Sequence, residues 1–311
     1  MCRGFSGVTC RMLFRFYAQL QVLLQTRGLV GGCYIPVFFK PNSSEFKPTV
    51  SSPAMMTTAV RAARAAADYI VRASRRLDNL QISEKGPNDF VSEVDQQAEL
   101  RIIETIHKAY PDHAILAEES GEQGKHEYQW IIDPLDGTTN FLHGYPCYSV
   151  SIAVRLNGRL EHGVVYDPNL DELFCASRGN GAMMNNRRIR VARRANLRGA
   201  LLATGFPFRS DQNLEQYMKT LQALIKKTSG IRRPGSAALD LAYLAAGRVD
   251  GFWEFGLRPW DTAAGALLVQ EAGGLVSDMR GGHDFLESGD IVAANPKVLR
   301  EILTTIRPYL A

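Results

Sequence analysis

Cysteine is scarce in this chain, with five among 311 residues and no CxxC pair. Three of the five lie near the N-terminus, and Cys147 and Cys175 are far apart in the sequence. The pattern therefore indicates neither a zinc site nor a disulfide framework, and it favours a reduced protein of the cytoplasm.

Acidic residues are almost absent from residues 1–54, which carry six Lys and Arg and one acid, Glu45. The net charge of +4 less the +5 of this segment leaves −1 for the remainder. The body of the protein is therefore no general binder of polyanions.

Long apolar runs are also missing from residues 1–54. None reaches the ~18 residues of a membrane span, so we expect no membrane contact.

The run WIIDPLDGTTNF at residues 130–141 is the feature around which the sequence is organised. Its apolar start predicts the end of a buried strand, and its proline and glycine then turn the backbone. Asp133 and Asp136 are three residues apart across this turn, so their carboxylates can face one point with the Leu135 carbonyl between them. Such a set of hard oxygen ligands suits Mg²⁺.

The residues after these acids suit an anion. Gly137 and Thr138 would open a helix, whose first N–H groups and dipole favour a phosphate. A metal beside a phosphate cradle is an arrangement for phosphoryl chemistry. The simpler interpretation is a plain turn, because Asp-Pro and Asp-Gly are both common turn pairs.

Hydrophobic periodicity predicts both helices and strands. Helices are expected from Thr58 and from about Ser92, and strands at 114–117 and 129–132. Asn157-Gly158 predicts a two-residue hairpin. Further elements are expected at 173–176 and 249–255 (strands) and at 237–246 and 296–306 (helices, the last capped by Asn295).

Two more acidic motifs accompany the central run: AEES at residues 117–120, and WDTAAG at 260–265, which opens a long apolar helix. Together the three motifs resemble the inositol monophosphatase family of Mg²⁺-dependent, lithium-sensitive phosphatases. The resemblance runs from about Met56 to the C-terminus. It is strongest for the bacterial SuhB-type members, through TGFPFR at 204–209 and GIRR at 230–233.

The resemblance implies an α/β fold, the family's layered α-β-α-β-α sandwich, with an α+β half at about 55–198 and an α/β half at about 199–311. For residues 1–54 two interpretations stay open. Their Arg-rich, acid-poor composition is typical of an organelle transit peptide. We favour the alternative that translation starts at Met55 or Met56, because the resemblance begins there.

The resemblance also implies a set of metal ligands. Glu118, Asp133 and the Leu135 carbonyl would hold one Mg²⁺, and Asp133, Asp136 and Asp261 a second. A third, weaker ion would lie near Glu118.

Catalytic roles follow from the same resemblance. Thr138 would orient the attacking water, supported by Asp95, and Glu118 is counted with them as catalytic. The backbone N–H groups of Gly137 and Thr138 would hold the phosphate. Since no His or Cys lies in the three motifs, we expect direct attack by water and no phosphoenzyme on such a residue.

The resemblance also implies that Glu254 recognises the leaving alcohol, with Arg232 as a further contact and residues 235–237 as a backbone contact. Glu254 could instead be a surface acid, and Arg232 a solvated charge. The substrate-binding residues are therefore predicted to be Leu135, Asp136, Gly137, Thr138, Arg232, Gly235, Ser236, Ala237, Glu254 and Asp261.

The expected reaction is Mg²⁺-dependent hydrolysis of myo-inositol monophosphates or similar polyol phosphates by a homodimer. 3′-Phosphoadenosine and fructose-1,6-bisphosphate phosphatases are alternatives, because the metal motif does not select the alcohol.

Phosphatase chemistry does not explain six arginines without an acid at residues 187–198. Such a run is usually a solvated face, or it contacts RNA phosphates. SuhB-type relatives are associated with transcription antitermination complexes, so the chain could instead act mainly as a binding partner there.

Overall fold

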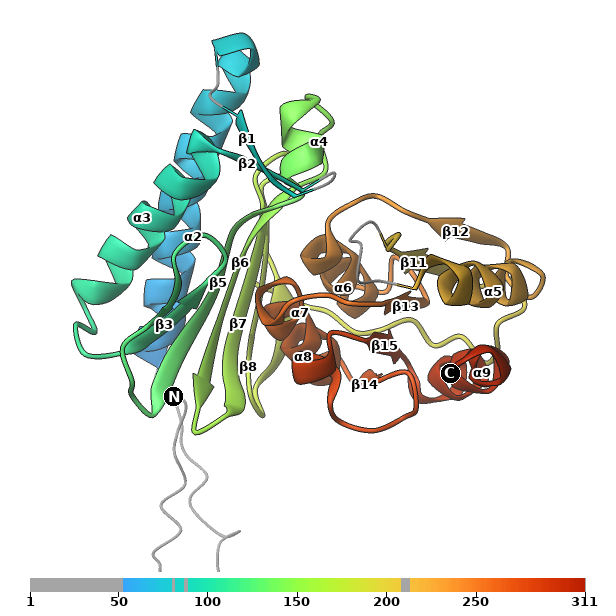
Figure 1. Ribbon diagram of the computed structural model, residues 1–311. Coiled ribbons are helices and arrows are strands. Elements are labelled where there is room, and N and C mark those ends of the chain that lie inside the picture. The colour runs from blue at the N-terminus through green and yellow to red at the C-terminus, as the bar shows by residue number, and fades with distance from the viewer. Residues whose placement is uncertain (1–52, 80–81, 87–88, 208–212, 311) are drawn as a thin grey trace, which may run out of the picture. The chain divides into compact units, whose positions relative to one another are not determined.

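The computed structural model describes residues 53–79, 82–86, 89–207 and 213–310 (Figure 1). The two interpretations of residues 1–54 thus fall almost wholly outside the described residues, and both stay predictions. In the described part, no helix combines the length and apolar character needed to span a bilayer.

Two helices near the start of the described chain pack against each other, α2 (Pro53–Ala73) and α3 (Glu93–His107). The first begins five residues before the predicted Thr58, and its buried face is built largely from alanines such as Ala59, Ala63 and Ala66. These small side chains let neighbouring backbones approach closely. The second helix begins where it was predicted, because the Ser92 side chain caps it. The segment between them contains η1 (Ser74–Asn79), β1 (Ile82–Gly86) and β2 (Asp89–Ser92).

The larger sheet has the order β10-β9-β8-β7-β6-β5-β3-β4 in the described residues. Every neighbouring pair is antiparallel except β3 and β5, which are parallel. The predicted hairpin is confirmed: Asn157 and Gly158 connect β6 to β7 with φ values of 48° and 81°. The strands are β3 (Ala114–Ala117), β4 (Gly121–Gln123), β5 (Tyr128–Asp136), β6 (Ser149–Leu156), β7 (Arg159–Asp167), β8 (Glu172–Ser177), β9 (Gly181–Met184) and β10 (Arg187–Arg188).

The smaller sheet has the order β12-β11-β13-β15-β14. Its first three strands run parallel and the other two pairings are antiparallel. The strand predicted at 249–255 is shorter, since β13 spans only Gly251–Glu254. The other strands are β11 (Leu201–Thr204), β12 (Gly230–Arg232), β14 (Leu275–Ser277) and β15 (Ile291–Ala294).

Helices α6 (Ala237–Ala245) and α7 (Pro259–Glu271) lie between the two sheets (Figure 1). Glycines allow this close packing. A Cβ on Gly163 of β7 would lie 2.8 Å from the Ala264 carbonyl oxygen of α7, and one on Gly265 would meet the Leu241 side chain of α6. The middle layer can therefore touch the large sheet almost backbone to backbone.

The outer layers complete the predicted α-β-α-β-α sandwich, which is confirmed. Helices α2 and α3 cover one face of the larger sheet, while α5 (Leu214–Ile225) and α9 (Pro296–Ile306) cover the far face of the smaller one (Figure 1). Asn295 caps α9 as predicted, accepting the N–H groups of Lys297 and Val298. The remaining helical segments are α4 (Thr138–Leu142), α8 (Phe285–Ser288) and η2 (Arg307–Tyr309).

Candidate active site

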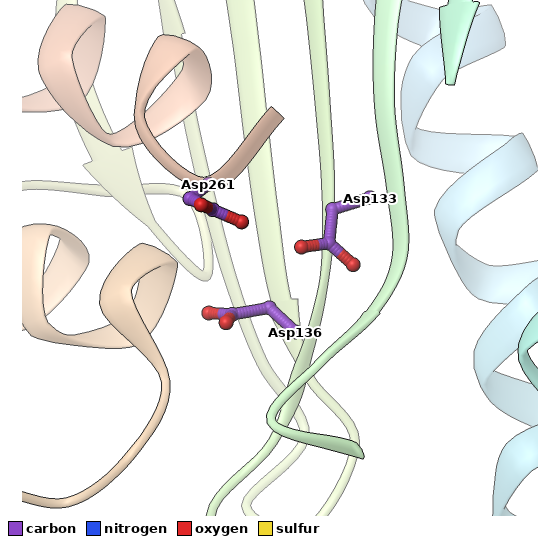
Figure 2. A group of neighbouring side chains, drawn as sticks. All are labelled: Asp133, Asp136 and Asp261. Carbon is purple, nitrogen blue, oxygen red and sulfur yellow. The ribbon is translucent and has the colours of Figure 1, made fainter. Parts of the chain in front are cut away.

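Three carboxylates converge beside the end of β5. One oxygen from each of Asp133, Asp136 and Asp261 lies within 4.8 Å of the others. Figure 2 shows the first two on β5 and its final bend and the third at the start of α7, all pointing into one space. Asp261 is held there because its Oδ2 accepts the Arg258 N–H at 2.7 Å.

An irregularity in β5 lets both of its acids face this point. In a regular strand, residues three apart lie on opposite faces of the sheet. Here Asp133 pairs with Ser151 and Asp136 with Ser149, so the register shifts between the two acids. The extra residue turns Asp136 back to the side of Asp133.

The carboxylates of the cluster are buried and repel one another, so a bound cation would stabilise their charged forms. Burial raises the pKa of Asp133 well above its usual value, and the charges of Glu118, Asp136 and Asp261 raise it further. Burial likewise raises the pKa of Asp136 to about 6, against the hydrogen bonds that it accepts. An all-oxygen set of close, mutually repelling acids fits a hard divalent ion such as Mg²⁺. The charge of Glu118 raises the pKa of both aspartates, so this predicted ligand lies near the cluster, while the carboxylates within 4.8 Å of one another are those of the three aspartates.

Asp136 accepts two hydrogen bonds from the N-terminal end of α6. Its Oδ2 accepts the Ser236 hydroxyl and the Ala238 N–H, the latter at 2.8 Å. Sequence reasoning assigned residues 235–237 to the substrate and missed this contact, for which no local signal exists. Their contact with substrate stays a prediction.

Thr138 and Asp95 are joined by a hydrogen bond. The Thr138 hydroxyl donates to Asp95 Oδ1 at 2.8 Å and lies 3.1 Å from the Leu135 carbonyl oxygen. Asp95 Oδ2 in turn accepts the N–H and hydroxyl of Ser92, at 2.8 and 2.6 Å. The same carboxylate thus completes the cap of α3 and fixes the hydroxyl of α4.

Gly137 makes the tight approach of the signature turn possible. Its φ is +99°, and a Cβ there would lie 2.9 Å from the Cys147 carbonyl oxygen and 3.2 Å from that of Gly235. The helix that it opens is short, since α4 ends at Leu142. Asn140 ties this turn to the chain before α6 by donating to the carbonyls of Cys147 and Pro234, at 2.7 and 2.8 Å.

Glu99, a buried acid on the same helix as Asp95, fixes the loop that carries Glu118. Its carboxylate accepts the N–H groups of Glu119 and Ser120, both at 2.9 Å. Glu99 is 3% exposed, which excludes a merely solvated acid. Sequence reasoning missed it, although it follows Asp95 by four residues and therefore lies on the same face of α3.

The predicted alcohol-binding acid, Glu254, is buried at the end of β13. Any Cβ on Gly205 would overlap its carboxylate, which explains the glycine in the TGFPFR motif. Asp240, a buried acid that sequence reasoning passed over, lies nearby: burial raises its pKa, and so do the charges of Glu254 and Asp136. Arg233 acts in the opposite direction on that pKa.

The predicted Arg232 is exposed on β12, and its guanidinium donates to the Ile231 carbonyl oxygen at 3.2 Å. Its neighbour Arg233, also exposed, is close enough to Asp240 to lower the pKa of that carboxyl group. The binding role given to Arg232 stays a prediction.

The arginine run divides into structural and exposed members. Arg194 pairs at 2.9 Å with Asp250, a buried acid that also accepts the Leu201 N–H. Arg187 and Arg188, which form β10, are exposed. Only part of the run is therefore free to meet a partner.

The sequence model of the inositol monophosphatase family matches residues 53–310. Nus factor SuhB of Pseudomonas aeruginosa is 57% identical over 262 residues, covering 82% of this chain and 97% of the relative. Two solved structures, each spanning 82% of this chain, are also similar. Extragenic suppressor protein suhB from Bartonella henselae has 46% identity and a TM-score of 0.80 over 98% of its length. Inositol monophosphatase from Anabaena has 38% identity and a TM-score of 0.71 over 96% of its length.

The family match, the layered fold and the similarity to SuhB proteins agree with one another. This chain belongs to the inositol monophosphatase family and is of the SuhB type.

Proposed function

We propose that the protein is a Mg²⁺-dependent phosphatase that hydrolyses myo-inositol monophosphates or similar polyol phosphates by direct attack of water. The observation that carries this proposal is the carboxylate cluster of Asp133, Asp136 and Asp261 at the end of β5. The solved relative from Anabaena, which has the same fold, is named an inositol monophosphatase.

The residues present fit Mg²⁺, because the cluster offers oxygen ligands only and its charges repel one another without a cation. When bound, Mg²⁺ would polarise the phosphate and lower the pKa of the attacking water. The residues proposed to hold it are Glu118, Asp133, Leu135 through its carbonyl, Asp136 and Asp261.

The chain's own groups would orient the reactants. Because the Thr138 hydroxyl donates a hydrogen bond to Asp95, a lone pair of its oxygen would accept a hydrogen bond from the attacking water. The backbone N–H groups of Gly137 and Thr138 would hold the phosphate oxygens. An ionised carboxylate accepts hydrogen bonds and donates none. The Glu254 carboxylate would therefore accept hydrogen bonds from hydroxyls of the leaving alcohol.

Phosphate release from a substrate panel tests the proposal. The panel holds myo-inositol 1-phosphate, 3′-phosphoadenosine 5′-phosphate and fructose 1,6-bisphosphate, each with and without Mg²⁺. We expect the inositol phosphate to be preferred and Asp136→Asn to abolish turnover while the protein stays folded. Preference for either other substrate would shift the assignment within the family. No Mg²⁺-dependent release from any of the three would refute the proposed reaction.

A second role, in a transcription antitermination complex, is favoured by two observations. The Pseudomonas relative is called a Nus factor, and Arg187 and Arg188 present exposed positive charge. Changing both to Glu should weaken binding to RNA or to the transcription machinery and leave hydrolysis within a few-fold. Asp261→Asn should do the reverse. The matched control changes Arg61 and Arg72, two arginines of α2, to Glu. An equal loss of binding in this control would contradict a specific binding surface at Arg187 and Arg188.

The proposal also covers the cellular location of the protein, its oligomeric state and the start of its folded domain. A folded domain beginning near Met55, acting as a cytoplasmic homodimer, is supported by the family resemblance and by the free thiols of Cys147 and Cys175.

A further inference from the structure

A cavity of about 490 Å³ lies on the outer side of the smaller sheet, between α9, η2 and the turn that follows β14. Three arginines, Arg280, Arg300 and Arg307, line it together with the apolar side chains of Met279, Leu303 and Leu310. None of the acids of the candidate active site lines this cavity.

Arg300 and Arg307, two of the three lining arginines, are exposed. In the part of the chain that the structure describes, neither Arg300 nor Arg307 forms an ion pair, in contrast to Arg194 and Arg248. The carboxylate of Glu301, next to Arg300 in the sequence, accepts the Leu197 N–H at 2.8 Å. An anion can therefore reach these guanidinium groups.

The turn that carries Arg280 has a fixed shape. Asp278 Oδ1 accepts the N–H groups of Arg280 and Gly282, at 2.8 and 2.9 Å, so this carboxylate is engaged within its own turn. Gly281, with a φ of +87°, passes close to the Leu303 side chain of α9. One wall of the cavity is thus held in place by backbone hydrogen bonds.

Helix electrostatics explain only one of the three charges. Arg307 follows the last residue of α9, where a cation is favoured by the helix dipole. Arg300 lies in the middle of the helix and gains nothing from that effect. Arg300 lines the same cavity as two further arginines and three apolar side chains.

We propose that this cavity binds a small organic phosphate with an apolar or aromatic body, in the size range of a nucleoside phosphate. Guanidinium groups bind phosphate oxygens in pairs and stack on flat rings, while Met279 and Leu303 would contact the apolar body. The volume lies within the ~300–1,000 Å³ usual for small-molecule sites. Since its lining offers no carboxylate, the site would bind its ligand without hydrolysing it. It is separate from the proposed phosphatase site.

Calorimetric titration of the full chain with ADP tests this site. EDTA is present throughout so that phosphate binding through Mg²⁺ at the carboxylate cluster does not contribute. We expect saturable one-site binding that weakens about tenfold or more in Arg300→Gln/Arg307→Gln. Inorganic phosphate and adenosine alone should each bind more weakly than ADP, because each fills half of the site.

Matched variants separate the site from general attraction. Arg187→Gln/Arg188→Gln removes the same charge from another exposed surface, and Lys297→Gln changes the first turn of α9; both should keep wild-type affinity. Arg300→Lys keeps the charge and the fold but loses the planar fork, and we expect an intermediate loss. The proposal is overturned by absent ADP binding at millimolar concentration, by unchanged affinity in Arg300→Lys, or by an equal loss in the control pair. Binding of an RNA oligonucleotide but not of ADP would overturn it as well.

Discussion

The Thr138 hydroxyl donates a 2.8 Å hydrogen bond to Asp95 Oδ1, joining residues 43 positions apart in the sequence. The bond links the first residue of α4 to the first turn of α3. Because Asp95 also accepts two hydrogen bonds from Ser92, its carboxylate cannot turn away from the threonine. The Asp95 carboxylate is thereby held as a hydrogen-bond acceptor beside the Thr138 hydroxyl.

Removing this hydroxyl should slow the reaction without unfolding the protein. Thr138→Val keeps the shape of the side chain, and we expect kcat to fall by about 10²-fold or more, in the range of general-base effects, with little change in KM. Thr138→Ser keeps the hydroxyl and should retain most of the activity. Steady-state kinetics on the preferred substrate measure both. Equal activity of the Val and Ser variants would contradict the role of Thr138 in orienting water.

The raised pKa of Asp136 predicts how stability depends on pH without metal. Burial raises this pKa from 3.8 to about 6 in the folded protein. The folded state therefore binds the proton more tightly. The stability that this group contributes is full below pH ~3.8 and lost as the pH rises through ~6. With EDTA present, Asp136 should make the protein more stable at pH 5 than at pH 7.5 by about 1 kcal/mol, or ~2–4 °C in Tm.

Thermal melts at the two pH values, for wild type and Asp136→Asn, measure this effect. The Asn variant should lose most of the pH dependence attributed to Asp136, and at pH 7.5 without metal its Tm should equal or exceed that of wild type. Saturating Mg²⁺ should reverse the ranking, because only the ionised wild-type cluster binds the ion well. An identical pH dependence in both proteins would refute the assignment to Asp136.

Glu99 should control Mg²⁺ affinity through the loop that carries Glu118. In Glu99→Gln the amide can accept only one of the two N–H groups, so the loop of Glu119 and Ser120 loses a hydrogen bond. We expect the Mg²⁺ concentration for half-maximal activity to rise about tenfold, as for other groups that position metal ligands, with kcat at saturating Mg²⁺ nearly kept. Glu104→Gln, exposed on the same helix, is the control and should behave as wild type. A fall in kcat with unchanged Mg²⁺ dependence would argue against positioning.

Gly137→Ala should damage both fold and activity. The new Cβ would lie 2.9 Å from the Cys147 carbonyl oxygen, and the residue would keep a φ of +99°. The control is Gly158→Ala, at a φ of +81° with nothing within 4 Å of the added Cβ, which carries the backbone penalty alone. The control should lose about 1–2 kcal/mol of stability and keep its activity, while Gly137→Ala should lose more stability and nearly all phosphate release. Denaturant unfolding and activity assays compare the two, and equal losses would show that the contact with Cys147 is unimportant.

Local sequence determined the elements with strong periodicity and recognisable ends. Ser92 and Asn295 cap helices where predicted, and Asn157-Gly158 forms the predicted hairpin, because the backbone preferences and short-range hydrogen bonds at these positions involve near neighbours. The acids of the three motifs could be singled out for the same reason: a carboxylate at the end of an apolar run is visible in the sequence itself.

Tertiary structure alone decided which of these acids meet and what holds them. Ser236 and Ala238, 100 and 102 residues away in the sequence, donate hydrogen bonds to Asp136. Glu99 accepts hydrogen bonds from a loop that begins 20 residues further along the chain. Arg233, which follows β12, lies close enough to the buried Asp240 to lower the pKa of its carboxyl group. Such contacts join segments that sheet pairing and helix packing bring together, and they leave no periodic signal in either partner.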